Sequence, residues 1–97
     1  MGNIPLDDYI IDTLMPDLVG HDRQPAAFLV FLFLWRNTLG RARTGMSLRQ
    51  IAEGTGLSKR SVQSGLSRLA KRSLISVRRE SITAIPEYSV HRTWTRP

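Results

Sequence analysis

Polar and basic side chains gather on one short stretch of this sequence. The stretch follows Ser58 and contains Lys59, Arg60, Ser61, Gln63, Ser64 and Arg68. Hydroxyl, amide and guanidinium groups near the start of one helix match the donors and acceptors that base edges present in the major groove of duplex DNA. The amino terminus of a helix also attracts phosphate. The set suggests no enzymatic reaction, so we predict a binding protein and not an enzyme.

This chain has few residues that could bind a metal ion, and none that could act through a thiol. It has no cysteine, which excludes disulfides, cysteine-ligated zinc and thiol nucleophiles. His21 and His91 are its two histidines, and they stand too far apart to have the spacing of a ligand pair. Asp7, Asp8 and Asp12 resemble a metal cluster only superficially, and we expect them to form a solvated helix face. We predict no catalytic residue, no metal site and no cofactor.

Charge is unevenly distributed along the chain. The formal net charge of the 97 residues is +6. Residues 1–38 contain five Asp and two Arg, which give a charge of −3. Residues 39–97 contain twelve Arg or Lys and three Glu, which give a charge of +9. Twelve of the fourteen basic residues are Arg, whose planar fork suits phosphates and guanine edges better than Lys does. Such a balance attracts polyanions without specifying a fold. The alternative is a solvated surface with a basic bias.

Residues 47–72 have the apolar spacing and turn signals of a helix-turn-helix. The first helix would begin at Ser47, and Ser58 would cap the second through its hydroxyl, a cap whose removal costs about 1 kcal/mol. Gly56 supplies the left-handed backbone that a turn between crossed helices needs. The apolar side chains recur at helical spacing and would face the core: Leu48, Ile51, Leu57, Val62, Leu66 and Leu69. The polar residues of the second helix then face outward.

Two further helices are predicted before this motif. Apolar spacing indicates the first over Leu6–Met15, and Pro16 would end it. The second would be capped by His21 or Asp22 and would run to about Leu39. Its apolar run at 26–35 is too short to cross a bilayer and starts too far into the chain for a signal peptide. We therefore expect a cytoplasmic protein without membrane contact, and a helix buried on more than one side.

A hairpin and a short tail are predicted after the motif. Alternation at period two indicates strands over Leu74–Arg79 and Glu87–Arg92, around a loop at Glu80–Pro86. Trp94 lies in the tail, and we expect it to pack back on the domain; the alternatives are that it contacts a partner chain or lies free. Arg78 and Arg79 either contact DNA or are solvated residues of the hairpin.

The stretch MSLRQIAEGTGLSKRSVQSGLSRLAKRSLISVRR, with YSV later in the chain, resembles the winged helix-turn-helix of bacterial transcriptional regulators, including the multiple-antibiotic-resistance-type group. The segments IDTLMPDL and FLFLWRNTLG are similar to the amino-terminal DNA-binding region of phage replication proteins. The winged-helix resemblance covers about residues 26–92. It implies a recognition helix over Ser58–Arg72 and a wing over Arg78–Pro86, whose basic residues would touch the DNA backbone or the minor groove.

The sequence departs from that resemblance at two positions. Ser73 stands where such proteins usually carry Gly, and Ser tolerates the left-handed conformation poorly, so we expect the helix end to be built differently. Gly65 lies inside the recognition helix, where Gly is about 1 kcal/mol less favourable than Ala. A close approach by the preceding helix would explain it.

These features predict a mainly α fold with a small β-hairpin, which is a three-helical bundle plus a wing and an extra amino-terminal helix. We expect one domain over residues 1–97, with the winged helix in 23–92 and a tail in 93–97. The helix and loop of residues 1–22, together with the apolar helix at 26–35, would supply a homodimer interface, because the chain has more apolar surface than its size easily buries.

The predicted function is duplex DNA binding by a sequence-specific transcriptional regulator. Arg60, Gln63 and Ser64 would meet base edges. The remaining members of the predicted DNA-binding set would cap the recognition helix or hold phosphates: Ser47, Arg49, Ser58, Lys59, Ser61, Arg68, Arg78 and Arg79. Two alternatives stay open, a phage or plasmid replication accessory protein and a winged-helix module that binds only protein.

Overall fold

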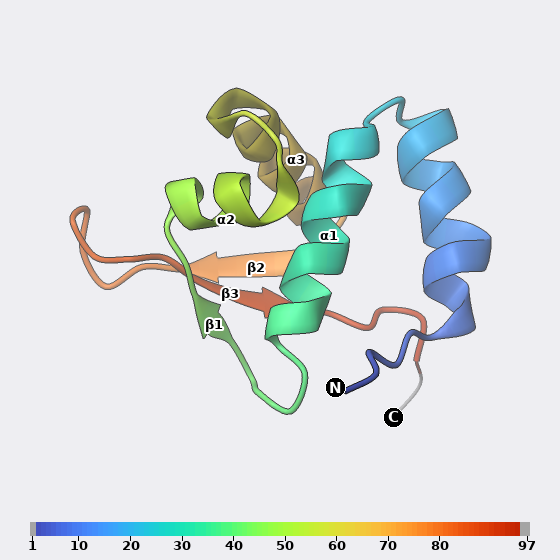
Figure 1. Cartoon of the computed structure of the whole chain (residues 1–97), viewed down its shortest axis with the longest axis horizontal. Coiled ribbons are helices and arrows are strands. Elements are labelled where there is room, and N and C mark those ends of the chain that lie inside the picture. The colour runs from blue at the N-terminus through green and yellow to red at the C-terminus, as the bar shows by residue number, and fades with distance from the viewer. Residues whose placement is uncertain (1, 96–97) are drawn as a thin grey trace.

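Helices and three short strands make up residues 2–95, the part of the chain that the computed structural model describes. The elements in chain order are η1 (Ile10–Leu14), η2 (Pro16–His21), α1 (Pro25–Asn37), β1 (Thr44–Gly45), α2 (Leu48–Thr55), α3 (Lys59–Lys71), β2 (Ile75–Arg78) and β3 (Glu87–Val90). Figure 1 shows α1 between the amino-terminal helical rod and α3, with the strands below α2 and α3. The result is a small α+β domain, which agrees with the predicted helices and hairpin.

Helix α1 is the centre of the core. Val30, Phe31 and Leu34 are fully buried. The helix contacts η2 on one side and α2, α3 and β3 on others. The prediction of a helix buried on more than one side is therefore confirmed, and most of the apolar run at 26–35 is covered by its own chain.

The amino-terminal helix is longer than predicted and has a wide, π-type geometry. The backbone N–H of Met15 bonds to the carbonyl of Ile10, and the helical rod continues through η2 to His21. The prediction that Pro16 ends this helix was wrong. Pro16 opens η2, and a residue in the first turn of a helical segment needs no N–H partner.

The start of α1 also differs from the prediction. Gln24 precedes the helix without a side-chain cap, so neither His21 nor Asp22 caps it, and Pro25 occupies the first turn. The His21 ring instead bonds to the carboxylate of Asp22 at 3.0 Å.

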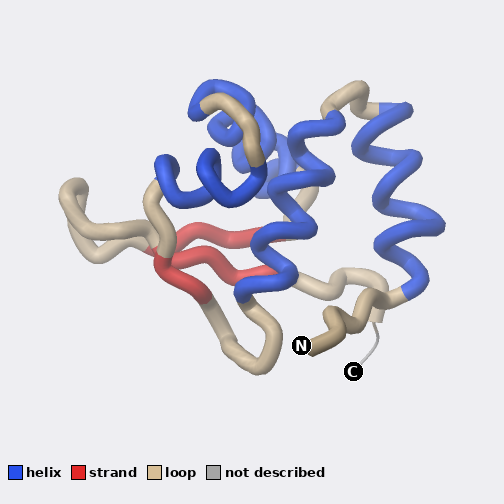
Figure 2. Tube along the Cα trace, viewed as in Figure 1, coloured by secondary structure: helices blue, strands red, loops and turns tan. Residues whose placement is uncertain are grey.

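The sheet has three antiparallel strands in the order β1-β3-β2, shown in red in Figure 2. The hairpin of β2 and β3 was predicted, and Ile75 pairs with Val90 in it. Strand β1 was not predicted, because its two residues are too few to show an alternating pattern. Thr44 pairs with Tyr88, which joins the connector before α2 to the hairpin.

Helices α2 and α3 have the predicted caps and turn. The Ser47 hydroxyl accepts from the N–H of Gln50, and the Gln50 side chain accepts from the N–H of Ser47. Gly56 has a φ of +79°, and the Ser58 hydroxyl accepts from the N–H of Ser61. The predicted inward residues are fully or partly buried: Ile51, Val62 and Leu69 fully, and Leu48, Leu57 and Leu66 in part.

Ser73, just after α3, and Gly65, inside it, are the two positions at which the sequence departs from the resemblance. Ser73 has a φ of +59°, and the N–H of Leu74 bonds to the carbonyl of Leu69 at 2.9 Å. The helix therefore ends as it would with Gly, and the expectation of a different end was wrong. Gly65 does mark a close approach, but by α1 and not by the preceding helix, since a Cβ there would lie 3.2 Å from the Ala27 Cα.

The tail returns to the amino-terminal segment. The Trp94 ring stacks on Tyr9 with ring centroids 4.8 Å apart, so the predicted packing is confirmed. Trp94 Nε1 donates to Asp7, and the Arg92 guanidinium donates to both carboxylate oxygens of the same residue. Asp7 is thus not part of a solvated face. Residues 96–97 of the predicted tail lie outside the described residues.

Candidate nucleic-acid interface

The outward face of α3 carries polar and basic side chains along its whole length. Lys59, Arg60, Gln63 and Ser64 are exposed, as predicted. Val62 and Leu69 on the opposite face are fully buried against the core, which fixes the rotation of the helix. The predicted base-reading residues therefore share one accessible side of the domain.

The same face extends beyond the predicted set. Ser67 and Lys71 are exposed and, with Gln63 and Ser64, line a hollow along α3. Sequence reasoning missed both residues. The signal was present, because positions 60, 63, 67 and 71 follow one another at helical spacing of three and four, and 64 lies four after 60 and three before 67.

The serines at the two helix starts are engaged in capping. Besides accepting the N–H of Ser61, the Ser58 hydroxyl donates to the Ser61 hydroxyl at 3.1 Å. Ser47 is bound within its reciprocal cap with Gln50. These residues position α2 and α3, whereas Arg49 extends outward and pairs with Glu53 at 3.2 Å.

Arg68 is partly exposed, lines the hollow along α3 and contacts the loop before α1. Its Nε donates to the Gln24 side chain at 3.3 Å and lies 4.0 Å from the Asp22 carboxylate. The Arg72 Nε lies 3.4 Å from the same carboxylate. The hydrogen bond from His21, and then the charges of Arg72 and Arg68, lower the pKa of Asp22 although its burial opposes this. Arg68 therefore ties α3 to the start of α1.

The hairpin loop presents two further cations. Arg78 and Arg79 are exposed where β2 ends. The Arg79 Nη1 donates to the carbonyl of Ile82 at 3.5 Å, which connects the base of the loop to its tip.

A groove of about 620 Å³ lies between α3 and this loop. Gln63, Leu66 and Ser67 line it from α3, and Arg79, Thr83 and Ile85 line it from the hairpin. Ser47 lines the end contributed by α2. The fold thus brings together predicted residues from all three elements, which are distant in sequence.

Cations without an ion pair lie on both elements that border this groove, and Arg23, Arg36 and Arg41 are unpaired on other segments of residues 2–95. Within residues 2–95, Arg43, Arg49, Arg68, Arg72 and Arg92 form ion pairs with carboxylates. The cations of the outward face of α3 and of the hairpin loop form no ion pair in that part of the chain: Lys59, Arg60, Lys71, Arg78 and Arg79. A polyanion that meets this side finds positive charge that acidic side chains have not neutralised.

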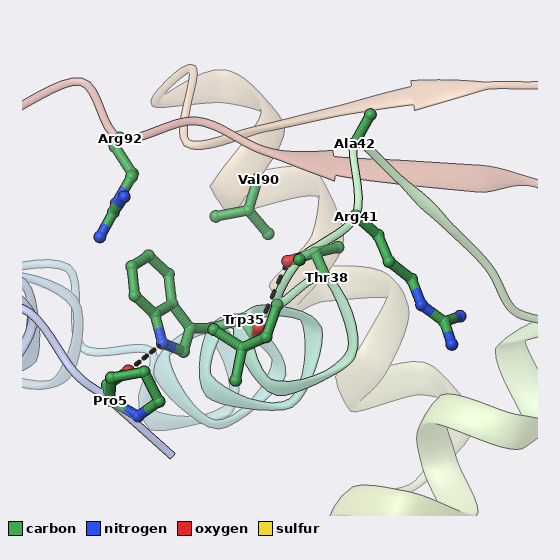
Figure 3. Close-up of a pocket in the computed structure, with 9 residues that line it drawn as sticks. Pro5, Trp35, Thr38, Arg41, Ala42, Val90 and Arg92 are labelled. Atoms are coloured by element: carbon green, nitrogen blue, oxygen red, sulfur yellow. Dashed lines mark hydrogen bonds between the residues drawn. The ribbon is translucent and has the colours of Figure 1, made fainter.

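A separate hollow of about 420 Å³ lies beside Trp35 (Figure 3). Pro5, Val90 and Arg92 are among its lining residues, and the Trp35 Nε1 donates to the carbonyl of Pro5 at 2.8 Å. No residue of the predicted DNA-binding set lines this hollow.

Two other classes of site have no counterpart in residues 2–95. No group of three or more His, Cys, Asp or Glu in this range is arranged to hold a metal ion. None of the described helices has the length and apolar character needed to cross a membrane.

No protein-family model matches the chain, and no curated protein and no solved structure is significantly similar to it.

Proposed function

We propose that this chain is a winged helix-turn-helix protein that binds duplex DNA. In this proposal α1, α2 and α3 form the three-helix bundle, and the loop between β2 and β3 is the wing. The order of the elements and the tight turn between α2 and α3 support it. An α-helix fits into the major groove, where its outward side chains meet base edges.

One observation carries the proposal. Helix α3 and the hairpin loop border one groove, and the exposed cations of these two elements form no ion pair among the described residues, while Arg68 and Arg72 are paired. Five of the eight Arg and Lys residues without an ion pair in residues 2–95 lie on these two elements, and a polyanion seated in the groove would meet them.

The side chains take different roles in this arrangement. Arg60, Gln63 and Ser64 would reach base edges, and Lys59, Lys71, Arg78 and Arg79 would hold phosphates. Ser47, Ser58 and Ser61 would act through the helix starts that they cap. Arg68 would act by holding α3 against the start of α1, and Arg49 would contact a phosphate only by leaving Glu53.

The test is the salt dependence of binding to random-sequence duplex DNA. We expect the logarithm of the affinity to fall linearly with the logarithm of the salt concentration, because phosphate contacts release counterions. Lys59→Ala should lower the slope by about one unit. Arg36→Ala is the matched control, because it removes an exposed cation from α1 and should leave the slope unchanged. Salt-independent binding, or no binding at low salt, would contradict the proposal.

Sequence-specific regulation is the biological role that we propose for this binding. In vitro selection from random duplexes should yield one preferred site for a regulator or for a replication accessory protein that recognises an origin. The genes that surround the selected site would separate those two roles. A module that binds only protein would select no site.

A further inference from the structure

The tip of the hairpin loop presents an apolar side chain to solvent. Ile82 is 90% exposed, the highest value among the large hydrophobic residues of 2–95, and Ile85 follows at 61%. Single exposed hydrophobic residues are common on proteins. Ile82 differs in its position, because it lies at the end of the loop that flanks the proposed DNA groove.

The loop holds this tip away from the body of the domain. The N–H of Ala84 bonds to the carbonyl of Ser81 at 3.2 Å, and the Arg79 side chain donates to the carbonyl of Ile82. The base of the loop is anchored because Pro86 is buried and its carbonyl accepts from the N–H of Met46 at 3.1 Å. In Figure 1 the loop extends beyond the strands at the end of the molecule opposite the amino-terminal rod.

Charge around the tip favours a polyanionic partner. Arg78 and Arg79 are exposed just before the loop, and the groove that Arg79 lines connects the loop to the outward face of α3. If α3 occupies the major groove of a duplex, one sugar-phosphate strand lies in the protein groove between α3 and the hairpin loop. The tip of the loop then reaches the adjacent minor groove of the DNA. Apolar side chains that enter the minor groove insert between base steps and kink the duplex.

Resting on the proposed DNA binding, we propose that Ile82 is such a wedge and that this protein bends the duplex it binds. The preferred partner is then a duplex with a flexible pyrimidine–purine step, TA or CA/TG, beside the base pairs that α3 contacts, because these steps unstack most easily. The preference comes from deformability, so it adds specificity at a step where no side chain needs to form a hydrogen bond with a base.

The experiment measures bending and binding in the same sample. The probe is a 30-base-pair duplex, about the length of three helical turns, with a central TA step and a donor and an acceptor dye at its two ends. Binding is followed by anisotropy at low salt, and bending by energy transfer between the dyes at saturating protein. We expect wild-type protein to raise energy transfer, and to raise it less on a duplex without pyrimidine–purine steps at its centre.

Variants separate the wedge from general binding. Ile82→Ser should return energy transfer to the level of the free duplex, while the salt slope stays the same because Ile82 carries no charge. Ile82→Leu should still bend the duplex. Ile4→Ser is the matched control, since it removes an exposed isoleucine from the amino-terminal segment and should not change bending. Circular dichroism verifies that each variant is folded.

The outcomes distinguish the two proposals. If wild-type protein binds without raising energy transfer, or if Ile82→Ser bends the duplex as wild type does, the wedge is wrong and DNA binding stands. If no anisotropy change occurs at low salt, DNA binding and the wedge are both wrong.

Discussion

Gln63 lines both hollows that run along α3, one toward the hairpin loop and one toward Gln24. Its amide offers both a donor and an acceptor, which is the pair of groups that the adenine edge presents in the major groove. Ser67 also lines both hollows, but its side chain has only a hydroxyl and no amide.

We expect Gln63→Ala to change which sites are selected. The variant should lose about 1–3 kcal/mol of discrimination at one base-pair position, because a bidentate contact to one base is removed. Selection experiments on wild type and variant measure the change directly. Lys59→Ala is the comparison, since it should weaken all sequences alike. Identical selected sites for Gln63→Ala and wild type would show that Gln63 does not read a base.

Asp7 receives hydrogen bonds from two residues of the tail. The bond from Trp94, and then the bonds from Arg92, lower the pKa of this carboxyl below its ordinary value of 3.8. A lowered pKa means that the ionised form is favoured by folding, so its contribution to stability is present above the ordinary pKa and is lost as the pH falls through the folded value.

We therefore expect Asp7→Asn to unfold at a lower urea concentration than wild type at pH 7. The difference should begin to shrink as the pH falls below 3.8 and should vanish below the lowered pKa of the folded carboxyl, where wild type is also neutral. Asp8→Asn is the control, because Asp8 is the exposed neighbour, and it should match wild type at both pH values. A destabilisation of Asp7→Asn that is equal at pH 7 and pH 3 would contradict the role of the charge.

Residue roles were predictable where they depend on neighbours in the sequence. The helical spacing that placed Arg60, Gln63 and Ser64 on the outward face needs no tertiary information. The engagement of Arg68 with Gln24 and of Asp7 with Trp94 could not be predicted, because these partners are 44 and 87 positions apart.

At the scale of elements, the end of α3 depends on one residue in a disfavoured conformation. Ser73 holds a φ of +59° so that the last carbonyls of α3 find partners. A residue with a Cβ pays about 1–2 kcal/mol for the left-handed conformation, and Gly does not.

We expect Ser73→Gly to stabilise the domain by about 1 kcal/mol. Urea denaturation followed by circular dichroism measures the difference. Ser67→Gly, inside α3, is the control and should destabilise by about 0.5–1 kcal/mol, because Gly there has a helical φ and only adds chain entropy. A Ser73→Gly variant no more stable than wild type would mean that Ser73 is not strained.

Gly65 allows α1 and α3 to pack closely. A Cβ at this position would lie 3.2 Å from the Ala27 Cα and 3.3 Å from the Ala26 carbonyl oxygen. Both are backbone atoms, so relief requires the helices to separate.

We expect Gly65→Ala to destabilise the domain by about 1–3 kcal/mol through overpacking, although Ala is the better helix former. The thermal midpoint of unfolding is the measurement. Ser64→Ala, an exposed change on the same helix, should leave the midpoint unchanged or raise it. A Gly65→Ala variant that is as stable as wild type would show that α1 and α3 can separate without loss.

The elements that sequence reasoning placed correctly have local signals. The caps at Ser47 and Ser58, the turn at Gly56 and the alternation of β2 and β3 are each specified within a few residues. Strand β1 is specified by Tyr88, far along the chain, and so it was missed. The helix through Pro16 was missed because a proline in the first turn of a new helical segment cannot be told in the sequence from a proline that ends the segment before it.

At the scale of the whole molecule, the acidic and basic parts of the chain meet in space. Asp17 and Asp22 lie beside Arg72, and Asp7 lies beside Arg92. The aspartates of the amino-terminal part thus neutralise arginines that have structural roles. Five of the eight Arg and Lys residues that form no ion pair within residues 2–95 lie on α3 and the hairpin loop, the side that we propose for DNA, while Arg23, Arg36 and Arg41 lie on other segments.

The amino-terminal rod leaves an apolar stripe uncovered on this molecule. Ile10, Leu14 and Leu18 are buried in the core, while Ile11, Met15 and Val19 are exposed at the same four-residue spacing. Because α1 buries most of its own apolar residues within the chain, the proposed homodimer would depend on this stripe and not on α1 as well.

We expect wild-type protein to sediment as a dimer at micromolar concentration and Met15→Glu to sediment as a monomer, since a charge in the middle of an apolar interface is not paired there. Ile82→Ser should remain a dimer, because the loop between β2 and β3 lies at the end of the molecule opposite the amino-terminal rod (Figure 1). A two-fold dimer would place two copies of α3 on one face of the duplex, so the selected DNA sites should be palindromes with half-sites about one helical turn apart. A wild-type monomer at micromolar concentration, or selected sites without two-fold symmetry, would contradict dimerisation through the stripe and would leave α3 reading a single site.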